Sequence, residues 1–458
     1  MTPAKKLAAT ALLAGAAALA GLQNAQAALP IQHWTQASGA QVFLVESPAL
    51  PMLDVQLDFD AGSRRDPPAQ AGLAEAAALM AGKGVAGRDG EPPLDENQLG
   101  QAWADLGASF AASASDDRMS FTLRTLTDPG LLPKAVELAA RQLGQPAWPD
   151  AVWQRERERL SAALKEARSR PGVVAQLAFD KAVFGQHPYG QETTPETLSR
   201  IGIDDLRQRY AAIAPCRAKV SLVGAVSREQ ADQIAAQLLS RLPQQDAAAC
   251  PPLPPVAEVP ALAAPLEQRI AFDSAQAHVL IGQPGYKRSD PAYFALLVGN
   301  HILGGGGFTS RLTEQVREKR GLSYSVYSYF MPGLHAGAFA IGLQTRPDQA
   351  GQALAVARQV LRDFVADGPT EAELQAAKDN LIGGFALRID SNRKLLANVA
   401  NIAWHDLPLD YLDHWSERVQ SVTAPEIRAA FQRVLQPDRM VTVVLGGASA
   451  GQSTQASP

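Results

Sequence analysis

An arginine and a tyrosine in the second half of the chain have the residue types and spacing of a hydrogen-bond donor pair. Arg317 lies in the last turn of a predicted helix from about Ser310 to Arg320, which Gly321 would end as a C-cap. Tyr324 lies where a strand is expected to begin. A guanidinium and a phenol together suit a peptide carbonyl or its oxyanion. Arg317 could equally offset the helix dipole, and Tyr324 could equally pack in a sheet.

Four consecutive glycines, Gly304–Gly307, precede that helix and join it to an earlier helical segment. Because glycine has no Cβ, backbone at these positions can approach a bound peptide closely. The four glycines are therefore candidate substrate-binding residues. A tight turn between two helices would require the same residues, so the sequence leaves both roles open.

The sequence contains no other recognisable catalytic or metal-binding motif. The seven histidines include no H-x-x-E-H or H-x-x-x-H motif, the spacings that place two imidazoles on one helical face to hold zinc. The chain also lacks the G-x-S-x-G nucleophile motif, a P-loop and a dinucleotide-binding fingerprint. No segment by itself therefore brings together a nucleophile and a base.

The elements that must position these residues occur twice along the chain. A helix followed by a strand, before the middle of the chain, resembles another helix and strand near the C-terminus. Three pairs of equivalent residues lie 221, 221 and 222 positions apart: Leu206 and Ile427, Tyr210 and Phe431, and Gly224 and Gly446. Such a constant offset is typical of an internal duplication.

The segments upstream of these pairs agree with a duplication. The alternating strand at Val55–Phe59 has a counterpart at Ala277–Gly282, and each is followed by a helix. Ala108–Leu126 and Tyr324–Gln344 each read as a hairpin. We therefore expect an α+β fold of two homologous halves, each a mixed, mostly antiparallel sheet packed against helices.

The chain divides into five predicted segments. Residues 1–27 have a positive start, an apolar run and a small-residue cleavage pattern, which together predict a secretory signal peptide. A membrane anchor is the alternative, but the apolar run is short and rich in alanine and glycine. Domains at 28–242 and 267–450 flank a Pro/Ala-rich linker at 243–266, and a flexible tail occupies 451–458. We expect export to a bacterial periplasm without stable membrane insertion.

Charge and cysteine content limit the remaining possibilities. Lysine and arginine number 42 against 46 acidic residues, a net charge of −4, and no basic run suggests a nucleic-acid partner. Cys216 and Cys250 are the two cysteines of the chain. An exported protein could pair them in a disulfide, but the sequence leaves two free thiols equally open.

The glycine-rich segment also carries a family resemblance. The stretch GGGGFTSRLTEQVREKRGLSYSVYS is similar to a segment of the pitrilysin/insulysin-type zinc peptidases, which include mitochondrial processing peptidase and bacterial two-subunit homologues. The segments AGSRRDPPAQAGLAEAAALMAGKG and FGQHPYGQETTPETLSRI extend the resemblance over essentially all of the chain after the signal peptide. It implies two α+β halves per unit, with units that close like a clamshell around a peptide.

The resemblance also implies roles for individual residues. The family holds zinc on an inverted H-x-x-E-H motif in one half, while an arginine and a tyrosine from another half hold the substrate. The R-x6-Y pattern of that pair falls on Arg317 and Tyr324, and the family's glycine-rich turn falls on Gly304–Gly307. Catalytic roles for the pair and substrate binding by the glycines are therefore expected.

The zinc motif itself is degenerate. The family's G-L-A-H-x-x-E-H-M falls on GLAEAAALM, so Glu75 and Leu79 replace the two histidines and Ala78 replaces the general base. Alanine, at about Ala162 or Ala163, occupies the region of the third ligand. Zinc needs about three protein ligands and an activated water, so we expect this chain to bind no zinc or other cofactor.

Two functional hypotheses follow. The first is a non-zinc-binding subunit of a periplasmic metallopeptidase, which supplies Arg317 and Tyr324 to a homologous zinc-bearing partner for peptide hydrolysis and is inactive alone. The second is a non-catalytic peptide-binding or scaffold protein with the same fold. Retention of both residues favours the first, because a scaffold has no need of the pair. A stand-alone peptidase would need a site that no motif supports.

Overall fold

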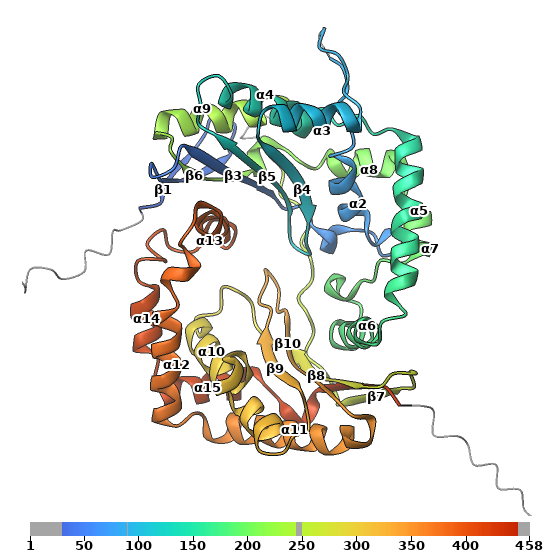
Figure 1. Cartoon of the computed structure of the whole chain (residues 1–458), viewed down its shortest axis with the longest axis vertical. Helices are drawn as coiled ribbons and strands as arrows, with labels where there is room; N and C mark the ends of the chain where they lie inside the picture. The colour runs from blue at the N-terminus through green and yellow to red at the C-terminus, as the bar shows by residue number, and fades with distance from the viewer. Residues whose placement is uncertain (1–29, 89, 244–249, 448–458) are drawn as a thin grey trace, which may run out of the picture.

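Each half of the chain builds one β-sheet with helices packed against it, as the computed structural model shows (Figure 1). The structure describes residues 30–88, 90–243 and 250–447. The expected signal peptide at 1–27 and the expected tail at 451–458 lie outside the described residues, as does part of the predicted linker. Within the described ranges, no helix is long and apolar enough to cross a membrane.

The two sheets are mixed and mostly antiparallel, as expected. The first has the order β1 (Gln32–Thr35), β2 (Gln41–Glu46), β6 (Lys219–Gly224), β3 (Met52–Phe59), β5 (Met119–Leu126), β4 (Ser109–Ala114). The second has the order β7 (Leu266–Ile270), β11 (Val441–Leu445), β8 (Ala277–Pro284), β10 (Ala338–Thr345), β9 (Ser325–Phe330). Only β2 with β6 and β7 with β11 pair in parallel among these described strands.

Helices follow the strands in both halves. The first half contains α2 (Leu73–Met80), α3 (Glu96–Asp105), α4 (Leu132–Gly144), α5 (Asp150–Ala167), α6 (Pro171–Phe184), α7 (Pro195–Ser199), α8 (Ile203–Tyr210) and α9 (Arg228–Leu239). The second contains α10 (Tyr293–Asn300), α11 (Ala350–Asp367), α12 (Glu371–Gly383), α13 (Asn392–Trp404), α14 (Trp415–Ser421) and α15 (Ala424–Val434). Side-chain capping boxes begin several of them, as at Ser227 of α9 and Thr370 of α12.

The duplication predicted from the sequence is confirmed in the packing. Leu206 and Tyr210 of α8 are buried against the first sheet, and Ile427 and Phe431 of α15 are buried against the second. Each half therefore has an apolar core between its sheet and its helices, and the core of the second half extends to Phe43 and Val223 of the first sheet.

The two halves exchange one helix each. Residues 171–184 of α6 and 392–404 of α13 are equivalent under the same offset of 221 positions. Yet α6 packs on β8 and β11 of the second sheet, whereas α13 packs on β6, β3 and β2 of the first (Figure 1). The halves are consequently interlocked and do not separate at the linker alone.

Both exchanged helices dock through apolar side chains, and the interface of α13 adds a charged contact. The interface of α6 is apolar and contains Phe179, which is fully buried against residues of the second sheet. The interface of α13 includes Lys219 of β6, whose ammonium donates to the carbonyl of Ala403 at 2.7 Å and pairs with Asp406 at 2.6 Å. A cation from the first half thus caps the C-terminal end of a helix of the second half.

Replacing Lys219 with methionine should destabilise the protein by about 1–2 kcal/mol, because a partly buried, charge-assisted helix cap is lost. Urea unfolding of the purified chain measures the effect. Lys394→Met is the control, since Nζ of Lys394 bonds to its own exposed segment, at the carbonyl of Leu387 and the carboxylate of Asp390. Equal costs for the two substitutions would contradict the capping role.

The linker is fastened to both halves. Cys216 and Cys250 form a disulfide, with sulfurs 2.05 Å apart, which answers the question the sequence left open. Further along, Arg65 donates to the carbonyl of Pro254 at 2.8 Å. Glu258 then pairs with Lys287 of the second half at 2.6 Å. These three contacts therefore hold the described part of the linker against both halves of the chain.

Candidate functional site

The helix that carries Arg317 differs from the expected α-helix. Helical structure follows Ser310, and residues Thr313–Glu318 form a π-helix, η8, in which the amide of Lys319 donates to the carbonyl of Glu314. Such wide turns often occur at functional sites. The predicted end is confirmed, since Gly321 adopts φ +60° and its amide donates to the carbonyl of Arg317.

Arg317 and Tyr324 lie together, as the sequence predicted. The guanidinium carbon of Arg317 is 5.2 Å from the ring centre of Tyr324. The same carbon also lies 4.9 Å from the ring centre of Phe308. Tyr324 is 80% exposed, so its phenol can reach a bound molecule.

These residues line a cavity of about 500 Å³ beside the edge strand β9. Its walls include Tyr327 and Tyr329, whose rings stack at 5.9 Å. The sequence predicted a hairpin at Tyr324–Gln344 but gave no signal that places these two tyrosines or Phe308 at the site. The cavity thus combines a guanidinium, exposed phenols and apolar rings, a surface suited to an extended peptide.

The glycine loop borders the cavity with Gly304, Gly305 and Gly307, whereas Gly306 is not among its lining residues. A Cβ on Gly304 would lie 2.5 Å from the amide nitrogen of Ser328, so this glycine lets the loop pack on β9. Gly307 has φ +62° and open space around it. The turn itself therefore requires glycine at 304 and 307, while substrate contact stays a prediction.

Helix α2, at the position of the degenerate motif, has the geometry of a packed structural helix. Ala78 is buried, Leu79 is half-buried, and Glu75 is the one metal-ligating side chain among the three. Among the described residues, no group of three or more His, Cys, Asp or Glu side chains could hold a metal ion. The side chains at these positions do not fit zinc, because alanine and leucine offer no lone pair.

The start of α2 is fixed by a buried carboxylate. Asp66 accepts from the amide of Ala74 at 3.1 Å and lies 3.3 Å from Nε of Arg209. Burial raises the pKa of Asp66 to about 6 despite these partners. Desolvation, followed by the charges of Asp66 and Asp116, raises the pKa of Glu75 as well. Burial at this end of α2 thus disfavours the charged form of both carboxyl groups.

Asp180 of α6 is a second carboxyl with a raised pKa. Desolvation, assisted by the charge of Asp116 and opposed by a 2.8 Å hydrogen bond from Gln176, raises it to about 6. The folded state therefore binds a proton that the unfolded state has already lost between about pH 4 and 6, so stability falls as pH rises through this window.

We expect Asp180→Asn to stabilise the protein by about 1–2 kcal/mol at pH 7.5, because it removes the cost of an ionised, desolvated carboxylate. The gain should largely disappear near pH 3, below the ordinary pKa of 3.8, where Asp180 is mostly protonated in both states. Urea unfolding at the two pH values measures it. A gain of the same size at both would show that ionisation is not the cause.

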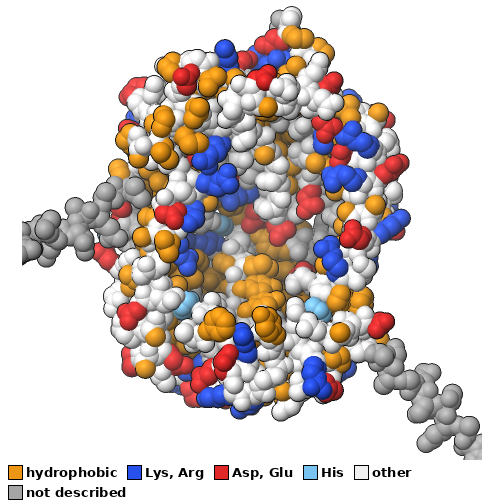
Figure 2. Space-filling view, viewed as in Figure 1, with side chains coloured by type: hydrophobic (Ala, Val, Ile, Leu, Met, Phe, Trp, Pro, Cys, Tyr) orange, Lys and Arg blue, Asp and Glu red, His pale blue; other side chains and the backbone are white. Residues whose placement is uncertain are grey.

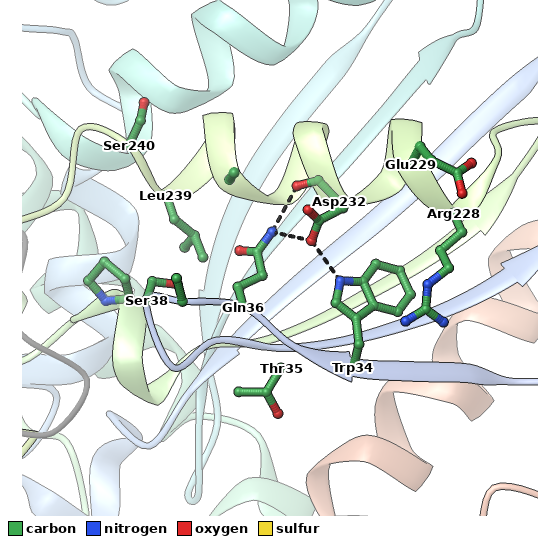
Figure 3. A pocket seen from close by; sticks show the side chains of 12 residues that line it. Trp34, Thr35, Gln36, Ser38, Arg228, Glu229, Asp232, Leu239 and Ser240 are labelled. Carbon is green, nitrogen blue, oxygen red and sulfur yellow. Dashed lines mark hydrogen bonds between the residues drawn. The ribbon is translucent and has the colours of Figure 1, made fainter.

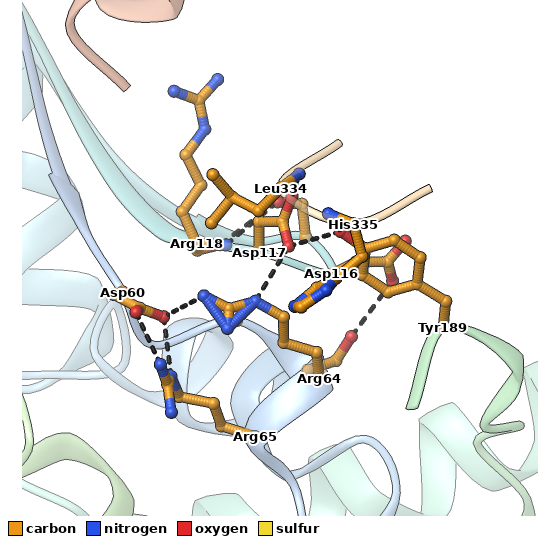
Figure 4. Close-up of polar contacts among 12 residues, drawn as sticks. Asp60, Arg64, Arg65, Asp116, Asp117, Arg118, Tyr189, Leu334 and His335 are labelled. Carbon is orange, nitrogen blue, oxygen red and sulfur yellow. Dashed lines mark hydrogen bonds and ion pairs between the residues drawn. The ribbon is translucent and has the colours of Figure 1, made fainter. Parts of the chain in front are cut away.

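The two halves meet at Asp117, in the turn between β4 and β5 (Figure 4). Its carboxylate accepts from Nε of Arg64 at 2.9 Å, from the phenol of Tyr189 at 2.7 Å and from the amide of Leu334 at 2.9 Å. The amide of His335 donates in turn to the oxygen of Tyr189 at 3.2 Å. This network ties the turn between β9 and β10 to the first half. The space-filling view shows a face that is hollowed in its centre (Figure 2).

A separate cavity of about 690 Å³ lies beside β1 and α9 (Figure 3). The indole of Trp34 donates to Asp232 at 2.6 Å, the amide of Gln36 donates to the same carboxylate at 2.8 Å, and Arg228 stacks on Trp34 at 4.5 Å. These polar groups bond to one another, and none of them belongs to the Arg317 site.

Comparison with known families accounts for both halves. Residues 41–196 match the model of insulinase (peptidase family M16), and residues 200–381 match that of the peptidase M16 inactive domain. A solved structure, the peptidase M16 inactive domain of Pseudomonas fluorescens, is 34% identical, with a TM-score of 0.85, and the match covers 93% of this chain and 99% of that one.

Individual relatives are more distant. The non-peptidase homolog YmxG of Helicobacter pylori is 27% identical over 413 residues, which cover 89% of this chain and 91% of that protein. The periplasmic protease PqqL of Escherichia coli shares the fold, with a TM-score of 0.76 at 18% identity, over 91% of this chain and 45% of that one. With its degenerate motif, the chain therefore belongs to the insulinase (M16) peptidase family as an inactive member.

Proposed function

We propose that this chain is the non-zinc-binding subunit of a two-subunit insulinase-type metallopeptidase. It would supply Arg317 and Tyr324 across a shared cavity to a homologous partner that carries an intact H-x-x-E-H motif. The observation that carries the proposal is the juxtaposition of these two side chains in an open cavity, while positions 75, 78 and 79 hold no zinc site.

The division of labour follows from the chemistry of each side. In the partner, zinc would supply an activated water for attack on the scissile carbonyl. In this chain, the guanidinium of Arg317 and the phenol of Tyr324 would donate to the carbonyl oxygen and stabilise the negative charge that develops on it. The aromatic wall formed by Tyr327 and Tyr329 would hold neighbouring parts of the peptide.

The segment at 1–27 supports export, and we infer that the complex works in the periplasm. Both subunits would then meet peptides outside the cytoplasm. A stable disulfide between Cys216 and Cys250 agrees with an oxidising compartment.

Co-expression with a homologue that retains H-x-x-E-H tests the proposal. The two chains should co-purify, and a quenched fluorescent peptide should be hydrolysed by the pair but not by this chain alone. Activity of the zinc-bearing homologue that is unchanged by adding this chain would rule out the subunit role.

A scaffold or peptide-binding function is the alternative. It would be favoured if the two chains associate but the pair loses no activity when both Arg317→Ala and Tyr324→Phe are introduced. The cavity would then serve binding without contributing to the reaction.

A further inference from the structure

Phe308 is an exposed apolar residue without a packing role. It follows the four glycines directly, and its side chain is 72% exposed, although large apolar side chains usually gain stability from burial. A single exposed apolar ring is ordinary on a protein surface. Here, however, the ring centre lies 4.9 Å from the guanidinium carbon of Arg317, inside the candidate site, so its exposure calls for a functional explanation.

The backbone on both sides of Phe308 is fixed. The hydroxyl of Ser310 donates to the carbonyl of Gly307 at 2.8 Å, and Ser310 is itself fully buried. The amide of Gly306 donates to the carbonyl of His301 at 2.7 Å. The loop therefore presents the ring from an anchored turn, with Gly307 in a left-handed conformation that glycine adopts without strain.

Arg317 and Arg311 lie on the same helical segment but have different partners. Arg311 is held by Glu373 through two hydrogen bonds, of 2.5 and 2.7 Å, which occupy its donors. Arg317 pairs with the adjacent carboxylate of Glu318, which lies 3.3 Å from its Nε, and its Nη nitrogens form no hydrogen bond within the described residues. Two aromatic rings also contact its guanidinium.

This arrangement has a chemical consequence. A carboxylate bound to the Nη nitrogens, such as Glu373 at Arg311, would compete with a substrate carbonyl for these donors, whereas Glu318 approaches Arg317 at Nε. Contact with an aromatic ring restrains the cation through the ring's negative face and leaves the donors in the guanidinium plane available.

We propose that Phe308 is a positioning residue, which holds the guanidinium of Arg317 beside Tyr324 and keeps its Nη donors available to a peptide carbonyl. The inference rests on the proposed function, in which Arg317 acts on the substrate. It assigns a role to the residue that follows the glycines and explains why an apolar ring is left exposed there.

The test compares Phe308→Ala, Phe308→Leu and Phe308→Tyr in the complex with the zinc-bearing partner. The alanine and leucine variants should lower kcat/KM about threefold to thirtyfold, while tyrosine, which keeps a π-face, should stay within about threefold of the native complex. Leu387→Ala is the control, because Leu387 is similarly exposed, at 67%. A leucine variant as active as the tyrosine variant would overturn the proposal.

A second comparison uses the Arg317→Ala background. Phe308→Ala should cause no further loss there, because the ring acts through Arg317. A loss of the same size in both backgrounds, or weakened association of the two chains, would overturn the positioning role. If Arg317→Ala alone has no effect, the proposed function itself fails, which is a separate result.

The isolated chain provides a readout that needs no partner. Phenylglyoxal modifies accessible guanidinium groups, and mass spectrometry can follow Arg317 and Arg320 separately. Phe308→Ala should raise the modification rate of Arg317 severalfold and leave that of Arg320, which bonds to Gln315, unchanged. An unchanged rate at Arg317 would show that the ring does not restrain it.

Discussion

Replacing Arg317 with alanine should lower kcat/KM of the two-chain complex about 10²–10³-fold, the effect of removing one donor from an oxyanion site. The guanidinium contacts Phe308 and Tyr324 and pairs with Glu318 through Nε, so its Nη nitrogens are the donors that the substitution removes. Hydrolysis of a quenched fluorescent peptide by the purified complex measures the change.

Arg320→Ala is the matched control for this experiment. Arg320 lies three residues further along, is exposed, and uses its guanidinium to bond to Gln315. We expect its replacement to change activity by less than about threefold, since it loses only surface contacts. Equal effects of the two substitutions would show that positive charge in general, and not the position of Arg317, matters.

The largest effect on stability is expected at Phe179. This side chain is fully buried where α6 docks on the second sheet, and a Cβ on Gly282 of β8 would lie 2.7 Å from its ring. Phe179→Ala leaves a cavity in a tightly packed interface and should cost about 3–5 kcal/mol in the free energy of unfolding. Urea denaturation of the purified chain measures it.

Lys181→Ala serves as the control on the same helix, because Lys181 is exposed and alanine favours a helix. It should change stability by less than about 0.5 kcal/mol. A cost of less than 1 kcal/mol for Phe179→Ala would contradict the conclusion that α6 is a main apolar connection between the halves.

The fold could be predicted from the sequence wherever the signal is local or repeated. The alternation at Val55–Phe59 and Ala277–Gly282 identified β3 and β8, and both predicted hairpins are present as β4–β5 and β9–β10. The constant offset identified α8 and α15 as equivalent helices. Each of these inferences depends on periodicity within a single segment or on comparison of two segments.

The exchange of α6 and α13 could not be predicted in the same way. Both helices have apolar faces, and the sequence does not say which of two similar sheets an apolar face will cover. The contacts that decide it are distant in the chain, as in the bond from Lys219 to the carbonyl of Ala403. The network at Asp117 is another case, because Tyr189 and Leu334 reach it from different halves.

The candidate site was partly predictable. The spacing of Arg317 and Tyr324 indicated that they could converge, and they do. The π-helical turn was not predicted, because its extra residue per turn depends on contacts made by the whole segment. Phe308 was missed since an isolated phenylalanine after glycines has no periodic or motif signal, and only its distance from Arg317 identifies it.

Zinc content distinguishes a non-zinc-binding subunit from a peptidase that works alone. Mass spectrometry of metals in the purified chain should find no stoichiometric zinc, because Glu75, Ala78 and Leu79 replace the two histidines and the glutamate of the family motif. The complex with the H-x-x-E-H partner should contain one zinc per pair and hydrolyse peptides. Stoichiometric zinc in this chain alone, together with peptidase activity that chelation abolishes, would contradict the account.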